Sequence, residues 1–260
     1  MDSADGLSKG MAATGGNKLA PAAAGGGLRL RSGGASIGVI ESLGLSPAVE
    51  ALDAMLKAAN VEVLRFEKLG LGWVIACIIG DVGSVTAAVE AGRAAAERLA
   101  KSGVTTAGVT KAMGGALDIV PVNSCLLASP SPAVLTLLRG AEGEQPAPSG
   151  GAIGYIETMG FAAAVQALDA MAKGAAVSFR GYSGTPPKFV MWIQGDVAAV
   201  RQALQQGAEV ADRIGKALGS CLLARPHLET MENLPAKPTA APLTSLAGGM
   251  PRHIKLLTAG

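Results

Sequence analysis

One segment of this chain occurs twice, and this repeat limits the fold more than any other feature. Residues 37–61 return as residues 153–177, at an offset of 116 positions without a gap. The segment Ser124–Ala128 returns as Ser220–Ala224, at an offset of 96. The chain therefore carries two diverged copies of one domain in tandem. The shorter second offset leaves the first copy with about 20 additional residues, near 104–122, which we interpret as a glycine-containing loop.

Hydrophobic periodicity predicts the same alternation of strands and helices in each copy. Apolar residues recur at helical spacing through Val49, Leu52, Met55, Leu56 and Ala59, and again from Val85 to Leu99. Runs rich in β-branched and aromatic residues predict strands. In the first copy we expect strand 37–41, a helix over 49–59, strands 61–66 and 73–79, a helix over 85–99 and strand 124–128. The order β-α-β-β-α-β predicts an α+β fold, a tandem duplication of a ferredoxin-like unit in which two helices cover one face of an antiparallel sheet.

Composition places the domain boundaries. We expect flexible tails at 1–35 and 231–260, because these segments are rich in Gly, Ala and Pro. A linker at 141–151 contains prolines that oppose helix formation. The predicted domains are 36–140, with the insertion near 104–122, and 152–230. The short basic and apolar stretch at 252–258 is either a docking helix or disordered, and its length favours disorder.

The charge balance excludes several classes of function. The chain has 22 basic and 20 acidic residues and a formal net charge of +2, with 3% aromatic residues, so neither nucleic acid nor an anionic membrane is an expected partner. The longest apolar run, Trp73–Ile79, is far shorter than a membrane-spanning helix. Acidic residues near the N-terminus argue against a secretory signal. Three separated cysteines indicate a reduced, cytoplasmic interior, and we expect Cys125 and Cys221 to be buried in equivalent strands rather than to bind metal.

Several of these segments resemble the shell domains of bacterial microcompartments. IESLGLSPAVEALDAMLKAANV and IETMGFAAAVQALDAMAKGAAV are similar to the first strand and helix of that family, and GDVGSVTAAVEAGRAAAE and GDVAAVRQALQQGAEVAD to its second helix. Residues 68–72 resemble its pore loop, and Ala224–His227 differs by one residue from its usual Pro-Arg-Pro-His ending. The resemblance covers most of 37–140 and 152–229. It implies the non-permuted tandem class, in which a homotrimer forms a pseudohexameric disc.

The resemblance also implies partners and sites. Discs would tile with other shell proteins, hexamers and pentamers, into a shell in the cytoplasm around encapsulated enzymes, and small metabolites would cross a central pore. The residues that would line the pore are Lys68, Leu69, Gly70, Leu71, Gly72, Tyr182, Ser183, Gly184, Thr185 and Pro186. Those that would form the disc edge are Lys57, Lys173, Arg225 and His227, although the first copy has no Arg or His at the places of the last two.

Other functions remain open at this stage. A soluble ferredoxin-like sensor of small molecules, or an enzyme, is the main alternative, and a redox conduit is a third. No catalytic or metal-binding spacing involves His227 or His253, no cofactor is expected, and neither pore-loop candidate contains a cysteine for an iron–sulfur cluster. The carboxylates that recur in equivalent positions, Glu41 with Glu157 and Asp53 with Asp169, favour an interface over acid–base catalysis. We therefore expect a structural protein and not an enzyme.

Overall fold

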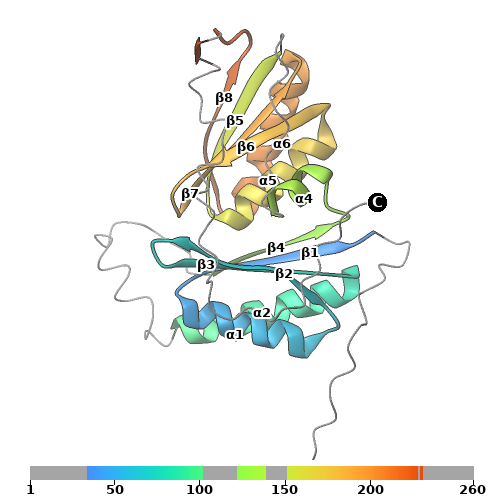
Figure 1. The fold of residues 1–260 in the computed structure, drawn as a ribbon, viewed down its shortest axis with the longest axis vertical. Coiled ribbons are helices and arrows are strands. Elements are labelled where there is room, and N and C mark those ends of the chain that lie inside the picture. The colour runs from blue at the N-terminus through green and yellow to red at the C-terminus, as the bar shows by residue number, and fades with distance from the viewer. Residues whose placement is uncertain (1–33, 102–121, 139–150, 228, 231–260) are drawn as a thin grey trace, which may run out of the picture.

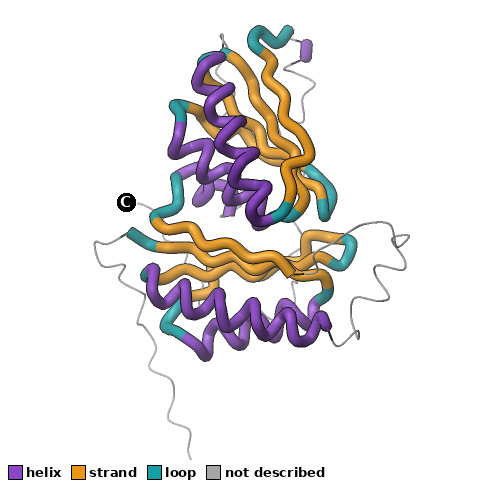
Figure 2. The backbone as a smooth tube through the Cα atoms, turned by 180° about the vertical axis from the view of Figure 1, so that it is seen from behind, coloured by secondary structure: helices purple, strands orange, loops and turns teal. Residues whose placement is uncertain are grey.

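Two α/β units follow one another in the chain, and each builds its own four-stranded sheet. A computed structural model describes residues 34–101, 122–138, 151–227 and 229–230 of the protein. The first unit lies below the second in Figure 1, and the same two layers of helix and strand are visible from behind in Figure 2. The predicted tails (1–35 and 231–260), the insertion (104–122) and the linker (141–151) lie, apart from residues at their margins, outside the described residues.

The first unit has the predicted element order. Its elements are β1 (Ser36–Leu43), α1 (Leu45–Ala58), β2 (Glu62–Gly70), β3 (Trp73–Gly80), α2 (Val82–Lys101) and β4 (Val122–Ala128). The strands pair in the order β2-β3-β1-β4, and every pair is antiparallel. A further short helix, α4 (Pro132–Leu138), follows the last strand.

The second unit repeats this arrangement. Its elements are β5 (Ala152–Met159), α5 (Phe161–Gly174), β6 (Val177–Ser183), β7 (Lys188–Gly195), α6 (Val197–Ile214) and β8 (Lys216–Leu223). The strand order is β6-β7-β5-β8, again antiparallel throughout. The prediction of a tandem α+β fold with β-α-β-β-α-β units is confirmed.

Local sequence explains how the strands turn into helices. Gly44 and Gly160, with φ of 106° and 98°, connect the first strand of each unit to its first helix, and this left-handed backbone favours glycine. The second helices begin differently. The carboxylates of Asp81 and Asp196 accept hydrogen bonds from the backbone N–H groups of Ser84 (2.9 Å) and Ala199 (2.7 Å), so both helices have an ordinary N-cap.

The sheet of the first unit is buried on both faces. One face packs on α1 and α2 through a cluster that includes Ile40, Met55 and Val85. The opposite face belongs to a second cluster that runs without interruption from Val39 into the second unit, where it includes Phe161. The two units are therefore joined by a continuous apolar core rather than by a linker alone.

Three details differ from the sequence-based expectations. The helix α4 was not predicted. The strand β2 runs on to Gly70, so that the turn is reduced to Leu71 and Gly72. Val49 and Leu56, which belong to the apolar pattern of the first helix, are exposed on the far side of α1 from its buried stripe.

In the part of the chain that the structure describes, no helix has the length and apolar character needed to cross a bilayer.

Candidate functional site

The helix α5 lies across the sheet face of the first unit that is turned away from α1 and α2 (Figure 1). Phe161 and Val165 on this helix are 2% and 0% exposed. They belong to the same apolar cluster as Val39 and Cys125 in the first sheet. Burial of apolar surface of this kind is the main stabilising term in association, so this contact is a built interface between two domains.

Glu41 is the polar group at one end of this interface. Its side chain is fully buried, and its two oxygens accept hydrogen bonds from the backbone N–H groups of Phe161 (2.9 Å) and Ala162 (3.3 Å). These are among the first N–H groups of α5, which have no partner within the helix. Burial raises the pKa of Glu41 to about 7, although the hydrogen bonds from α5 and from Asn123 act in the opposite direction.

Asp169 and Lys173 bind the second half of α5 to the backbone at and after the end of β4. One carboxylate oxygen of Asp169 accepts a hydrogen bond from the backbone N–H of Ser131 (2.7 Å), and the other pairs with the Lys173 ammonium at 2.5 Å. The same ammonium donates to the carbonyl of Ala128 (3.0 Å). The expectation that the recurring carboxylates serve an interface is confirmed for Glu41 and Asp169.

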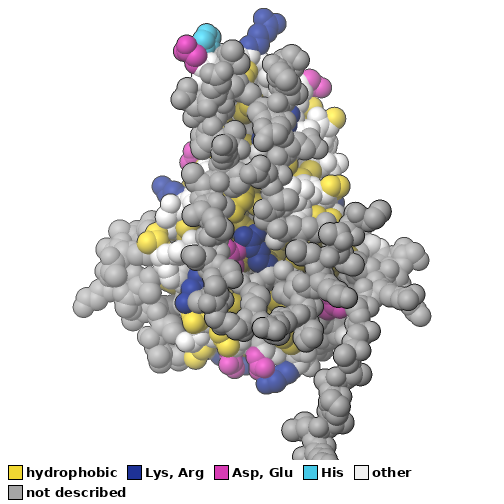
Figure 3. Space-filling model, viewed as in Figure 1, with side chains coloured by type: hydrophobic (Ala, Val, Ile, Leu, Met, Phe, Trp, Pro, Cys, Tyr) yellow, Lys and Arg dark blue, Asp and Glu magenta, His cyan; other side chains and the backbone are white. Residues whose placement is uncertain are grey.

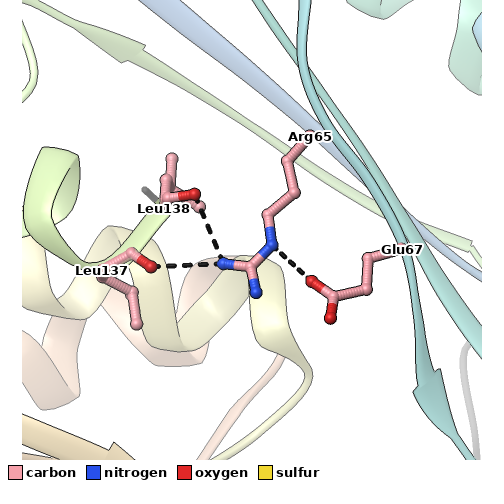
Figure 4. Close-up of polar contacts among 4 residues, drawn as sticks. All are labelled: Arg65, Glu67, Leu137 and Leu138. Carbon is pink, nitrogen blue, oxygen red and sulfur yellow. Dashed lines mark hydrogen bonds and ion pairs between the residues drawn. The ribbon is translucent and has the colours of Figure 1, made fainter. Parts of the chain in front are cut away.

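Helix α4 lies at the side of this interface and is bound to the first sheet by Arg65. The guanidinium of Arg65, on β2, donates from Nη1 to the carbonyls of Leu137 (3.2 Å) and Leu138 (3.3 Å), and from Nε to the carboxylate of Glu67 (Figure 4). These carbonyls end the short helix and have no partner within it. The signal for α4 was present in the sequence, as a proline followed by Val134, Leu137 and Leu138 at helical spacing.

The first helices of the two units are equivalent in sequence but not in burial. On α1, Leu45 and Val49 are 42% and 50% exposed, whereas their equivalents on α5, Phe161 and Val165, are buried. Leu56 of α1 is also 44% exposed. Apolar side chains show among charged ones on the lower surface of the molecule, over the helices of the first unit (Figure 3). We call Leu45, Val49, Leu52 and Leu56 the α1 face; Leu52, at its border, is half-buried against the core of the first unit.

The two sheets show the complementary difference. Four residues of the first sheet that α5 covers are buried, whereas their equivalents in the second sheet are half-buried; Ile153 and Trp192, also on that face of the second sheet, are buried. The matched pairs are Val39 with Tyr155, Ile75 with Val190, Cys125 with Cys221 and Leu127 with Leu223. Glu157, the equivalent of buried Glu41, is exposed. We call Tyr155, Val190, Cys221 and Leu223 the β8 face. The contact between the units joins α5 to the first sheet. The α1 face is the equivalent of the α5 surface and the β8 face is the equivalent of the sheet surface, and nothing in the described chain covers either of them.

The predicted pore residues lie at the turns between the second and third strands of each unit. Lys68, Gly70, Leu71 and Gly72 are exposed, and Leu69 is buried. In the second unit Tyr182 and Ser183 end β6, Gly184 and Thr185 are exposed, and Pro186 is buried. Both turns lie on the same side of the molecule, the left in Figure 1 and the right in Figure 2. The structure thus brings the two predicted groups to one side of the chain.

The predicted edge residues lie in three places. Lys173 lies in the contact between the units, whereas Lys57 forms an exposed ion pair with Asp53 at 2.5 Å. Arg225 and His227 are exposed in the segment after β8. No group of three or more metal-ligating side chains occurs among the described residues.

The cysteines are only partly as expected. Cys77 and Cys125 are buried, and burial raises the pKa of the Cys77 thiol to about 12 and also raises the pKa of the Cys125 thiol. Both therefore remain protonated and inert. The expectation that Cys221 is buried like Cys125 was wrong, because nothing in the described chain covers its side of the second sheet as α5 covers the first.

Comparison with known proteins identifies the fold. A model of the BMC domain matches residues 36–113, from β1 through α2 of the first unit, and residues 152–226, which span the second unit. The chain belongs to the BMC-domain family. It carries two BMC domains in tandem, as the sequence resemblance implied. The predicted insertion falls partly within the first match.

Named relatives of this BMC-domain chain are shell and assembly proteins. The carboxysome assembly protein CcmO of Synechococcus elongatus is 32% identical over 206 residues, which is 79% of this chain and 70% of the relative. The bacterial microcompartment shell protein PduA of Salmonella typhimurium is 48% identical over 64 residues, 25% of this chain and 68% of PduA. A crystal structure of a microcompartments protein from Desulfitobacterium hafniense aligns with a TM-score of 0.56 and 28% identity, over 76% of this chain and 99% of that chain.

Proposed function

We propose that this chain is a non-catalytic tile of a bacterial microcompartment shell, in which three copies close into a pseudohexameric disc. The observation that carries the proposal is the pair of uncovered faces. The α1 face and the β8 face repeat the two surfaces that are joined inside the chain, but neither is covered there. A surface that joins head to tail in this way forms a ring when the rotation closes and a filament when it does not. The alternating domains of three chains would supply the six sextants.

The position of the hairpin turns supports a pore at the centre of this disc. Because the turns ending at Gly72 and Pro187 lie on one side of the chain, a ring with that side inward would gather three copies of each around the axis. Exposed Lys68 would then add positive charge near the opening and favour anionic metabolites. Lys57, Arg225 and His227 are exposed on the chain and would contribute to the disc edge, together with Lys173 where its half-exposed side chain reaches the rim.

The relatives support the cellular role. Proteins named as carboxysome assembly and microcompartment shell components share this domain with the chain. We propose that the tile joins other shell proteins, hexamers and pentamers, in a cytoplasmic shell around encapsulated enzymes. The recurring carboxylates Glu41 and Asp169 hold helix α5 in place, which supports a structural use of these groups rather than a catalytic one.

The oligomeric state of the purified full chain tests this proposal. We expect sedimentation equilibrium to give the mass of three chains, and electron microscopy at higher concentration to show sheets, tubes or curved shells of disc-shaped particles. A monomer, or a small oligomer that never forms extended assemblies and instead binds a small molecule, would favour the sensor function and contradict the proposal.

Removing the charge at the proposed pore should change selectivity. In shells that enclose a reporter enzyme, we expect Lys68→Ala to reduce entry of an anionic substrate relative to a neutral one of similar size by about two- to fivefold, because solvent and salt screen a surface charge. The matched control is Arg201→Ala, which removes an exposed cation from the beginning of α6, at the end of its sheet remote from the turn. Equal selectivity in the Lys68→Ala and Arg201→Ala shells would contradict the placement of Lys68 at the pore.

A further inference from the structure

The contact between the two domains has a polar pattern that the uncovered faces repeat residue by residue. Inside the chain, Glu41 receives the first N–H groups of α5. The helix α1 begins in the same way, after a glycine of similar backbone conformation and without a capping side chain of its own. The residue of the second unit that corresponds to Glu41 is Glu157, at the same position in the first strand of its sheet. It is exposed, and therefore available to a second copy.

The far part of α1 also repeats its counterpart. Asp53 and Lys57 form the same ion pair, four residues apart, as Asp169 and Lys173, and both pairs measure 2.5 Å. In α5 this pair binds the backbone of Ala128 and Ser131. The corresponding backbone in the second unit, at the offset of 96 residues, is that of Ala224 and His227, which are exposed.

We propose that Glu157 of one copy receives the N-terminus of α1 of a second copy, while Asp53 and Lys57 of that helix bind the backbone of Ala224 and His227. This inference rests on the proposed ring, and it names the contacts that would close it. The α1 face would lie on the β8 face as α5 lies on the first sheet, so the apolar contact continues an interface already present in the fold. Each chain would give one α1 face and accept another, which is the head-to-tail pairing that a ring requires.

The nature of the contacts explains how the two copies of the domain can diverge without losing the pairing. Ser131 and His227 have unrelated side chains, but the atom that contacts Asp169 is the backbone N–H of Ser131, which every residue other than proline carries. Likewise Lys173 binds the backbone carbonyl of Ala128. The carboxylates, in contrast, act through their side chains, and Glu41, Glu157, Asp53 and Asp169 keep their identity in both copies.

Site-directed cross-linking of the full chain tests the register of this pairing. In a Cys221→Ala background, we expect Ser46→Cys combined with Glu157→Cys to give covalent trimers with a short bifunctional maleimide, because Ser46 corresponds to Ala162, whose N–H binds Glu41. Ser46→Cys combined with Glu90→Cys, an exposed position on α2, should stay uncross-linked. Two results would overturn the inference. One is equal cross-linking of the two cysteine pairs, and the other is no cross-linking of the Ser46→Cys, Glu157→Cys protein although it sediments as a trimer. Neither result would contradict the proposed disc.

A second measurement uses the apolar part of the same surface. Val49→Glu should weaken association of the full chain at least about tenfold in sedimentation, since it places a charge in the centre of the contact. Val82→Glu is the control, because Val82 is exposed to a similar degree (53% against 50%) but lies at the beginning of α2, outside both faces. Unchanged association of Val49→Glu in a trimeric protein contradicts the pairing, and a wild-type protein that remains monomeric contradicts both the pairing and the disc.

Discussion

Leucine at position 92 should destabilise the first domain by about 3 kcal/mol, the upper end of the usual cost of overpacking. Gly92 lies on the side of α2 that faces α1. A Cβ atom there would approach the Met55 Cγ to 2.5 Å, the Ile40 Cδ1 to 2.7 Å and the backbone oxygen of Ala51 to 2.9 Å. The first two atoms belong to side chains that can move, but the carbonyl belongs to the neighbouring helix. Any larger residue at position 92 must therefore push the two helices apart.

Two other glycines provide graded controls for this variant. Gly207 is the equivalent of Gly92 in α6, but the three atoms nearest to a Cβ there all belong to side chains, the nearest being the Met171 Cγ at 2.8 Å. At Gly83, in the first turn of α2, only the Asp81 carboxylate lies within reach, at 3.4 Å. Urea unfolding followed by circular dichroism should rank the loss of stability as Gly92→Leu, then Gly207→Leu, then Gly83→Leu. A Gly92→Leu protein as stable as Gly83→Leu would contradict the close helix contact.

The repeat made the fold predictable because local sequence determines local structure. The strand at Trp73–Gly80, the helix from Val82 and their equivalents follow from hydrophobic periodicity, and the two copies support each other's assignment. The positions of the hairpin turns followed in the same way, to within the few residues by which β2 extends. The family resemblance then covered both domains, and the BMC-domain match agrees with it.

What could not be predicted is the difference between the copies. Glu41 and Glu157 have equivalent positions in their strands, yet one is fully buried and the other exposed. Cys125 and Cys221 differ in the same direction. In each pair the difference comes from α5, which covers one sheet and not the other, and such packing between domains leaves no trace in the periodicity of either strand. The helix α4, which lies between the copies, had no second copy to support its assignment.

Replacing Glu41 with glutamine should flatten the dependence of stability on pH between about 5 and 8. The pKa of Glu41 is raised from 4.5 to about 7 in the folded protein, so the folded state binds the proton more tightly than the unfolded state. The stability that this group contributes is fully present below pH 4.5 and is lost as the pH rises through 7. At 1.36 kcal/mol per pKa unit the loss is about 3 kcal/mol. Glutamine keeps an acceptor for the helix N–H groups but cannot ionise.

Urea unfolding of the wild type and of Glu41→Gln, at intervals from pH 5 to pH 8, measures this difference directly. The two proteins should be similar at pH 5, and the variant should become the more stable one at pH 8, where the wild type must keep a charge in the interface. Glu90→Gln is the control, because it removes an exposed carboxylate from α2 and should leave the pH profile unchanged. The nearby Cys125 thiol does not contribute, since burial keeps it protonated throughout this range. Parallel profiles for the wild type and Glu41→Gln would mean that desolvation of Glu41 is fully offset by the N–H groups of Phe161 and Ala162, and that the interface holds an ordinary charged N-cap.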